Sequence, residues 1–271
     1  PVGEPFNFVE MVARELPLQA ICNILGVPQE DRGQLAEWVD LGTEAETGEV
    51  IATEYVRLVG AYGEQLIDRK RRQPADDILS VVVHARLDDG SQLNNRELRA
   101  FFSLLFPAGA ETTRSAIAGG LLALIENPDQ LARLRADRGL LKFAIEDMLR
   151  WTSPSVYKRR TAIDGVVLHG RRIERGQKVT IWEMSANRDE AIFADPFRFD
   201  IGRQPNPHIA FGYGPHFCLG ASLARLEMRV MFEDLLSRFD RFELAGEPRW
   251  TVNNRLVGLR DLPLRVTPTA A

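Results

Sequence analysis

A single cysteine, Cys218, lies in the glycine-rich run Phe211–Gly220, which reads F-G-Y-G-P-H-F-C-L-G. Its glycines have no Cβ, so the loop can adopt unusual dihedral angles and let a flat ligand come close. These glycines are Gly212, Gly214 and Gly220. An apolar helical stretch is predicted to start near Leu219, and the partial positive charge of a helix N-terminus favours a thiolate. The run therefore predicts a ligating thiol on a loop just before a helix.

Two other interpretations of this cysteine are open. Most lone cysteines are buried free thiols that serve only packing. A zinc site formed by His216 and Cys218 is the second alternative. Structural zinc needs four nitrogen or sulfur ligands, whereas the chain has only two Cys and four His, and Cys22 is far away in sequence. The complete ten-residue pattern favours the ligating thiol over both.

Composition is that of an ordinary globular protein. The chain has 271 residues, 45% of them hydrophobic and 27% charged, with a net charge of −4, which gives no argument for nucleic-acid binding. Two cysteines far apart indicate a reducing compartment, and we expect a cytoplasmic location. No apolar run approaches the length needed to cross a bilayer, so no membrane span is expected.

Apolar periodicity predicts a helical first part, residues 1–154, and a mixed β and irregular second part, residues 155–271. Helices are predicted at 6–25 with a break at Pro17, and at 32–41, 49–72, 76–85, about 95–126 with Asn95 as cap, 129–136 and 139–151. Strands are predicted at 158–162, 165–168, 178–182 and within 249–266, and a last helix at 219–239. The fold class is therefore mainly α with a smaller β part (α+β), as one domain that is incomplete overall.

The segment Ala108–Thr113, A-G-A-E-T-T, lies inside the longest predicted helix. Pro107 removes a helix hydrogen bond and Gly109 adds backbone entropy, so the sequence weakens its own helix here. A threonine hydroxyl can bond back to a carbonyl one turn earlier. The segment predicts either a kink needed only for packing or a pocket where the acid Glu111 and the alcohol Thr112 relay protons.

A third feature is the pair Asp147 and Arg150, which lie three residues apart on one helical face. Such a pair is most often a surface ion pair of about 0.2–0.5 kcal/mol.

Together these features resemble the cytochrome P-450 family of haem-thiolate monooxygenases, in its bacterial soluble type. The run around Cys218 is similar to the family's haem-ligand loop, F-x-x-G-x-H-x-C-x-G, and Ala108–Thr113 is similar to [AG]-G-x-[DE]-T-T. The helix of Asp147 resembles the family's E-x-x-R helix, with Asp in place of Glu. The resemblance covers the whole chain and implies the cytochrome P-450 fold.

The resemblance implies haem b as cofactor, with Cys218 as the axial ligand of its iron. Phe211 would shield the thiolate, Gly212, Gly214 and Gly220 would border the haem, and His216 and Arg160 would bind its propionates. Ala108 and Gly109 would leave space over the ring, Thr112 would hydrogen-bond dioxygen, and Glu111 would deliver protons. Arg198, within the P-x-R-F stretch Pro196–Phe199, would join Asp147 and Arg150 in a buried network.

The implied reaction is insertion of one oxygen atom from O₂ into an apolar small molecule such as a sterol, fatty acid or terpenoid. Electrons would come from NAD(P)H through a ferredoxin and its reductase. The stretches 149–154, 185–189 and 205–208 are similar to actinobacterial members that act on sterol side chains or related lipids. Two alternatives are a non-catalytic haem-binding relative or inactive fragment, and a helical interaction module without haem.

Members of the family carry a sizeable N-terminal portion before the segment that matches Phe6–Asp31. We expect the chain to be N-terminally truncated relative to them and, alone, to bind haem poorly.

Overall fold

The computed structural model describes residues 3–43, 49–251 and 255–269. Its first part is helical. A short strand, β1 (Phe6–Asn7), and a π-helical turn (Val9–Ala13) precede the first α-helix. The helices are α1 (Glu15–Leu25), α2 (Arg32–Thr43), α3 (Glu49–Arg72), α4 (Ile78–His84), α5 (Asn95–Glu126), α6 (Pro128–Ala136) and α7 (Leu141–Thr152).

The second part mixes short strands, two helices and long irregular stretches. Its helices are α8 (Glu183–Ala186) and α9 (Ala221–Arg238). Its strands are β2 (Tyr157–Thr161), β3 (Val166–Leu168), β4 (Arg171–Ile173), β5 (Lys178–Trp182), β6 (Phe239–Leu244), β7 (Arg249–Trp250), β8 (Leu259–Asp261) and β9 (Pro263–Pro268). All the pairs are antiparallel: β1, β9 and β6 form one sheet, and β2–β5, β3–β4 and β7–β8 form three ribbons.

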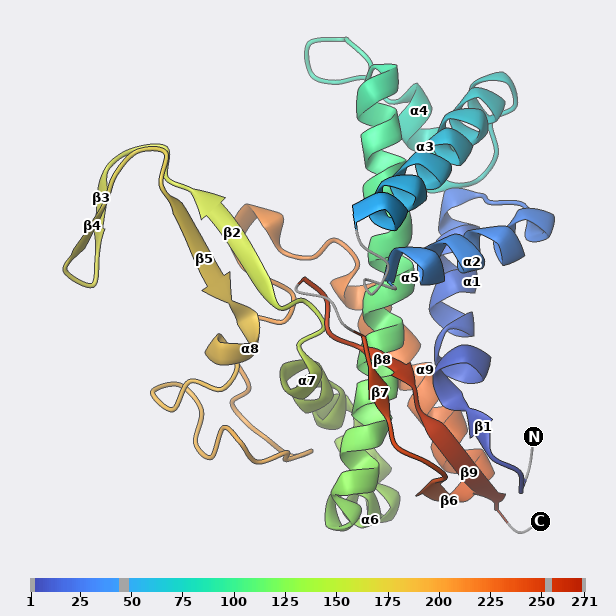
Figure 1. Cartoon of the computed structure of the whole chain (residues 1–271), viewed down its shortest axis with the longest axis vertical. Helices are drawn as coiled ribbons and strands as arrows, with labels where there is room; N and C mark the ends of the chain where they lie inside the picture. The colour runs from blue at the N-terminus through green and yellow to red at the C-terminus, as the bar shows by residue number, and fades with distance from the viewer. Residues whose placement is uncertain (1–2, 44–48, 252–254, 270–271) are drawn as a thin grey trace.

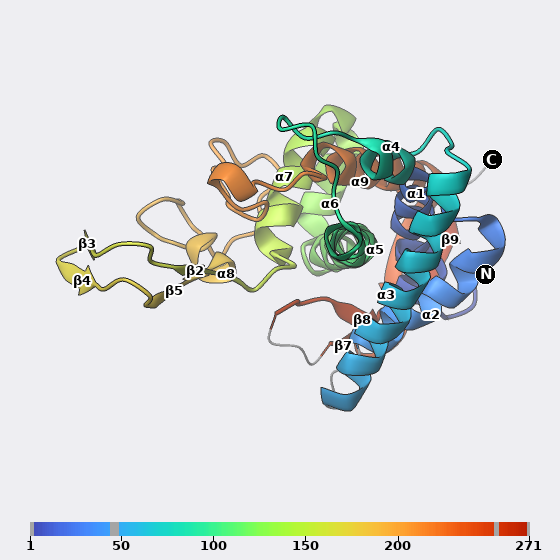
Figure 2. The ribbon, with the colours of Figure 1, turned by 90° about the horizontal axis from the view of Figure 1, so that it is seen from above.

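Helix α5 runs through the middle of the molecule and separates two sides (Figure 1). Helices α1 to α4 lie on one side of it. Strands β2 and β5, and the segment that leads into α9, lie on the other, as the view along α5 shows (Figure 2). In the part of the chain that the structure describes, no helix is long and apolar enough to span a membrane.

The predicted fold class is confirmed, and most predicted elements occur within a few residues of their expected bounds. Four details differ. The chain before α1 forms β1 and a π-helical turn, not one helix broken at Pro17. Asn94, not Asn95, caps α5, and Glu97 completes a capping box with it. Helix α8 and strands β4 and β6 were not predicted, and α9 begins at Ala221 and not at Leu219.

Buried apolar side chains form two clusters. One joins α1 to α4 with the first half of α5 and includes Leu18, Phe102 and Phe106. The other joins the second half of α5 to α7, α9 and the β1–β9–β6 sheet and includes Met148 and Phe232. Since the second cluster draws on residues from both sides of position 154, the two parts defined by sequence share one core.

Gly109 lies where α1 and α5 meet. A Cβ at this position would come within 2.8 Å of Cγ1 and 3.0 Å of Cβ of Ile21 on α1, which is closer than side chains tolerate. The glycine, costly inside a helix, therefore permits the close approach of α1 to α5.

We expect Gly109→Ala to destabilise the protein by about 1–3 kcal/mol, because the clash with Ile21 outweighs the roughly 1 kcal/mol that alanine gains over glycine in a helix. Urea-induced unfolding measures the change. Gly33→Ala on α2 is the matched control, since no atom lies within 4 Å of its Cβ position, and it should stabilise the protein. A Gly109→Ala variant as stable as wild type would contradict this packing role.

Candidate functional site

The loop around Cys218 is held by its own backbone. The N–H of Cys218 donates to the carbonyl of Phe211 at 2.9 Å, and the N–H of Gly212 donates to that of Ile209 at 2.8 Å. A 3₁₀ turn over Gly214–His216 lies between them. Gly212 and Gly214 both have φ of +74°, the left-handed region that favours glycine. The loop therefore closes on itself and presents Cys218 at the surface, three residues before α9 begins.

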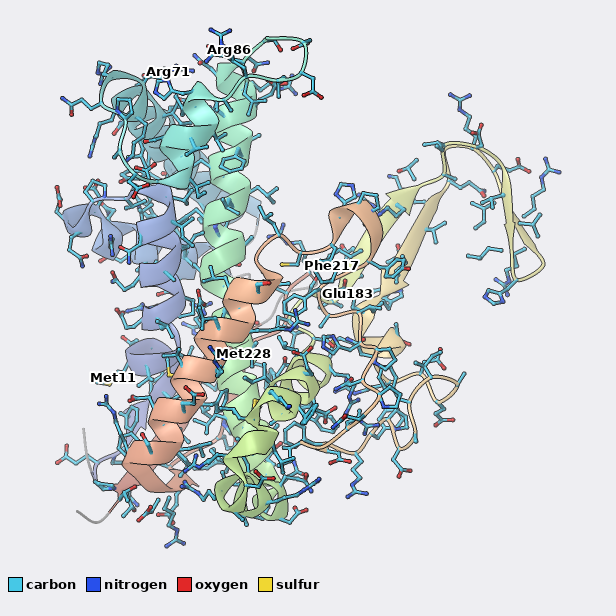
Figure 3. All side chains as sticks on the ribbon, turned by 180° about the vertical axis from the view of Figure 1, so that it is seen from behind. Met11, Arg71, Arg86, Glu183, Phe217 and Met228 are labelled. Carbon is cyan, nitrogen blue, oxygen red and sulfur yellow. The ribbon has the colours of Figure 1, made fainter. Side chains whose placement is uncertain are left out.

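The surface around Cys218 is open and apolar. Leu219 is 85% exposed, Tyr213 86% and Phe217 52%. Nothing lies within 4 Å of the positions where Gly214 or Gly220 would carry a Cβ. Phe217 marks this region on the side of α5 opposite to α1 (Figure 3). An exposed thiol ringed by uncovered apolar groups is a surface that a flat apolar ligand would cover.

Thr112 and Ala108 lie on one exposed face of α5, one turn apart. The Thr112 hydroxyl donates to the carbonyl of Ala108 at 2.8 Å, as predicted for this weakened segment of helix. Leu104, a further turn back, is 73% exposed. Phe102 and Phe106, by contrast, are buried against α1 to α4, and helix geometry puts them on the opposite side of α5. The face of α5 that carries Leu104, Ala108 and Thr112 is therefore turned away from α1 to α4, and Figure 2 shows β2, β5 and the segment that leads into α9 on that side of α5.

Gly109 does not share that exposed face. Its Cβ position is filled by Ile21 of α1, so it serves helix packing and not, as predicted, the ligand side of α5. Ala108 alone of the two small residues is exposed there.

Glu111, the residue before Thr112, is 6% exposed. Burial raises the pKa of Glu111 to about 7, against the opposing effects of Arg114 and Arg255, while Asp40 adds a further rise. Arg114 is itself paired, since its Nη1 lies 2.7 Å from Oδ1 of Asp40. A carboxyl group with this pKa can take up and release a proton near neutral pH.

The charge of Glu111 acts on Tyr55 of α3. Its hydroxyl is buried and has no hydrogen-bond partner in the described part of the chain, and burial together with the charge of Glu111 raises its pKa. The ring fits against Gly42, where a Cβ would come within 2.8 Å of it. The buried Tyr55 hydroxyl therefore experiences the charge of Glu111 without a hydrogen bond to it.

Asp147 and Arg150 form a buried ion pair on α7, not a surface pair. Both side chains are 0% exposed, and Nε of Arg150 donates to Oδ1 of Asp147 at 2.6 Å. The shorter aspartate therefore reaches its partner directly. The remaining donors of Arg150 bond the carbonyls of Asn187, Pro196 and Arg198 at 2.8–3.1 Å.

The third guanidinium of this network belongs to Arg203 and not to Arg198. Nε of Arg203 lies 3.1 Å from Oδ1 of Asp147, whereas Arg198 contributes its carbonyl, which accepts from Arg150 and Arg203. Asn206 and the N–H of Asp200 complete the shell of Asp147 at 3.3 and 2.7 Å. The resemblance pointed to the wrong arginine because the irregular chain between 187 and 210 folds back on α7, and only its path decides which side chain arrives.

Arg160 and His216, the two side chains that the resemblance assigns to the haem propionates, are both exposed. Arg160 on β2 donates from Nη1 to the carbonyl of Arg159 at 3.1 Å and interacts electrostatically with Glu183. Arg159 points to the other face of the strand. His216 lies at the end of the 3₁₀ turn before Cys218. Both side chains present nitrogen donors at the surface that a carboxylate of a ligand can accept.

The side chains suit a haem better than a bare metal ion. Among residues 3–43, 49–251 and 255–269 there is no group of three or more His, Cys, Asp and Glu side chains able to hold a metal, so the zinc alternative finds no complete ligand set there. One exposed thiol, an apolar surround, an arginine and a histidine are side chains that suit a porphyrin with one axial protein ligand and two propionates. The residues that would hold it are Cys218, His216 and Arg160.

Sequence reasoning missed several residues that organise the site. Arg203 and Asn206 complete the shell of Asp147, and Glu146, next to it, binds Arg225 of α9 and His208. The sequence signal for these residues was the pair of adjacent acids Glu146 and Asp147. Neighbouring side chains on a helix point in different directions, so each acid can bind a different partner.

Comparisons with known proteins agree with these features. A model of the cytochrome P-450 family matches residues 47–268. The chain is 53% identical to cytochrome P-450 126 of Mycobacterium tuberculosis, over 96% of this chain and 65% of that protein. It is 40% identical to the methyl-branched lipid omega-hydroxylase of Mycobacterium bovis, over 95% and 62%. It is 38% identical to the steroid C26-monooxygenase of Mycolicibacterium smegmatis, over 97% and 68%.

Among solved structures, a cytochrome P-450 of Mycobacterium marinum in complex with pseudoionone superposes with a TM-score of 0.91 at 36% identity, covering 97% of this chain and 66% of that one. The chain spans slightly less than two thirds of the length of the first of these relatives. The matched family model, the identity to these relatives and the shared fold lead to one conclusion: this chain belongs to the cytochrome P-450 family.

Proposed function

We propose that Cys218 is the axial ligand of a haem b iron and that the protein is a monooxygenase of an apolar small molecule. The observation that carries the proposal is the exposed thiol on a self-closed loop, on the side of α5 to which Thr112 is turned. When bound, a thiolate-ligated haem supplies the oxygen chemistry, because the thiolate pushes electron density that favours O–O cleavage.

The residues of this chain would then bind, shield and deliver protons. Arg160 and His216 would bind the propionates, and Phe211, whose ring lies 6.2 Å from that of Phe217 in the same loop, would shield the sulfur. Glu111 releases a proton toward Oγ1 of Thr112. Thr112 gives up its bond to the carbonyl of Ala108 when its hydroxyl passes that proton to the reacting oxygen.

The substrate class we propose is a sterol, methyl-branched lipid or similar apolar molecule. The uncovered apolar side chains on this side of α5, Leu104 and Leu219 among them, favour an apolar ligand. The printed names of relatives, a lipid omega-hydroxylase and a steroid C26-monooxygenase, support the same class.

We further propose that electrons come from NAD(P)H through a ferredoxin reductase and a ferredoxin that docks on the side of Cys218. The support is the family resemblance. A cytoplasmic location is proposed as well, because both cysteines are unpaired in the structure, as in a reducing compartment.

The competing function is haem binding without turnover. Asp147 in place of the family's glutamate favoured it on sequence grounds. That argument loses its force, since Asp147 is fully buried and hydrogen-bonded.

We expect the reduced, CO-bound protein to show the red-shifted Soret band of thiolate ligation, and Cys218→Ser to lose it. Absorption spectra of the 271-residue chain and of the full-length gene product measure this, and the shorter chain should retain less haem. Cys22→Ala is the matched control, because Cys22 is buried in the other core cluster and should leave the band in place. A full-length protein that binds no haem would overturn the assignment.

Thr112→Ala should uncouple the reaction, with more NAD(P)H consumed per product and more peroxide released, because the proton no longer has a hydroxyl through which to pass. Thr112→Ser keeps that hydroxyl and should restore most of the coupling. The measurement is the yield of product and of peroxide per NAD(P)H consumed, in the three proteins. Equal coupling in Thr112→Ala and wild type would rule out proton transfer through the Thr112 hydroxyl.

Glu111→Gln tests the state of the buried acid through stability. The folded-state pKa of Glu111, about 7, lies above its ordinary value of 4.5, so wild type loses stability as pH rises from 4.5 to 7, by roughly 3 kcal/mol. Glutamine cannot ionise, so the variant should match wild type near pH 4.5 and exceed it above pH 7. Thermal unfolding across this range is the measurement, and parallel curves for the two proteins would disprove the raised pKa.

A further inference from the structure

Glu146, next to Asp147 on α7, binds two partners that Asp147 does not touch. They are Arg225 on α9 and His208 in the chain before the Cys218 loop. Its carboxylate accepts two bonds from Arg225, from Nε at 2.6 Å and from Nη2 at 2.8 Å, which is a bidentate pair. Nε2 of His208 lies 3.0 Å from the same carboxylate. Burial alone would raise the pKa of Glu146, but the bonds from Arg225 and His208 outweigh it and lower the pKa to about 2.

His208 is held at both of its ring nitrogens. Its Nε2 faces Glu146, and the N–H of Ala210 donates to its Nδ1 at 3.3 Å. Its side chain is 3% exposed. The carboxylate of Glu146 therefore has two fixed partners, the guanidinium of Arg225 and the imidazole of His208.

Arg225 connects this cluster to the thiol loop. Its guanidinium lies 4.5 Å from the centroid of the Phe211 ring, a cation–π contact, and the carbonyl of Phe211 accepts the N–H of Cys218 at 2.9 Å. The hydrogen bond with Glu146 raises the pKa of Arg225. Arg225 therefore contacts the loop that carries Cys218 through one residue, Phe211, by its ring and by its carbonyl's bond to Cys218.

We propose that the Glu146–Arg225 ion pair is a positioning unit for the thiolate of Cys218. Glu146 holds Arg225 over Phe211 and balances its charge, and the pair together sets the reduction potential of the bound iron. The inference rests on the proposed function, since it requires haem bound at Cys218. It assigns Glu146 and Arg225 no contact with substrate.

Opposite charges on the two partners make the inference testable. Glu146→Gln leaves an unbalanced positive charge near the sulfur, which favours the reduced iron and should raise the reduction potential. Arg225→Gln leaves an unbalanced negative charge and should lower it. The double variant removes both charges and should return the potential close to wild type. A role limited to packing would move both single variants in the same direction, because both lose the same contact.

Spectroelectrochemical titration of the full-length holoprotein measures the potential. Asp234→Asn and Arg238→Gln are the matched controls: they break a pair with a 2.7 Å contact on the same helix, four residues apart and solvent-exposed, and should shift nothing. Arg225→Lys keeps the positive charge, so its reduction potential should stay close to that of wild type. If Glu146→Gln does not fold, the comparison of Arg225→Lys with Arg225→Gln still separates an effect of charge from an effect of packing.

The outcomes separate this inference from the proposed function. Opposite shifts in the two single variants, recovered in the double variant, support it. Shifts of the reduction potential that have the same sign in both single variants, or that do not exceed those of the Asp234 and Arg238 controls, overturn it. In that case a thiolate Soret band in the wild-type protein still supports the proposed function. A wild-type protein without thiolate-bound haem overturns both.

Discussion

Two adjacent carboxylates on α7 anchor the irregular chain that carries Cys218. Asp147 accepts hydrogen bonds from Arg150, Arg203, Asn206 and the backbone of Asp200, all between 2.6 and 3.3 Å. Glu146 accepts from His208 and Arg225. Buried backbone groups outside helices and strands need other hydrogen-bond partners. The contacts of the α7 side chains supply part of these, in place of the regular hydrogen bonds of a strand or helix.

The charges in this anchor have little freedom to rearrange. Arg150 is fully buried, and its donors are shared between one carboxylate and three carbonyls from the segment that it holds. Removing one partner of a buried pair leaves an uncompensated charge, at a cost of about 3–5 kcal/mol. The position of the Cys218 loop is therefore coupled to the integrity of α7, although the two are far apart in sequence.

The open side of α5 has the opposite character. Leu104, Leu219 and Tyr213 are between 73% and 86% exposed there, while both core clusters lie elsewhere. A rigid, charged anchor behind the thiol and an uncovered apolar surface in front of it suit a ligand that is held by one bond at its centre and by apolar contact over its faces. The exposed side chains of Arg160 and His216 offer the edge contacts that propionates would need.

The linear sequence determined the class of the fold and the residue types that the candidate site contains. Apolar periodicity located nearly every helix, and three short patterns identified Cys218, the Glu111–Thr112 pair and the Asp147–Arg150 pair, because each depends on spacing along one loop or one helix. Tertiary structure alone decided which distant residues meet them. Arg203 in place of Arg198, Ile21 against Gly109, and Arg225 against Glu146 all follow from the path of chain between elements, where no periodic pattern constrains the backbone. Local geometry is encoded within a few residues, whereas the partner of a buried charge depends on how the whole chain closes around it.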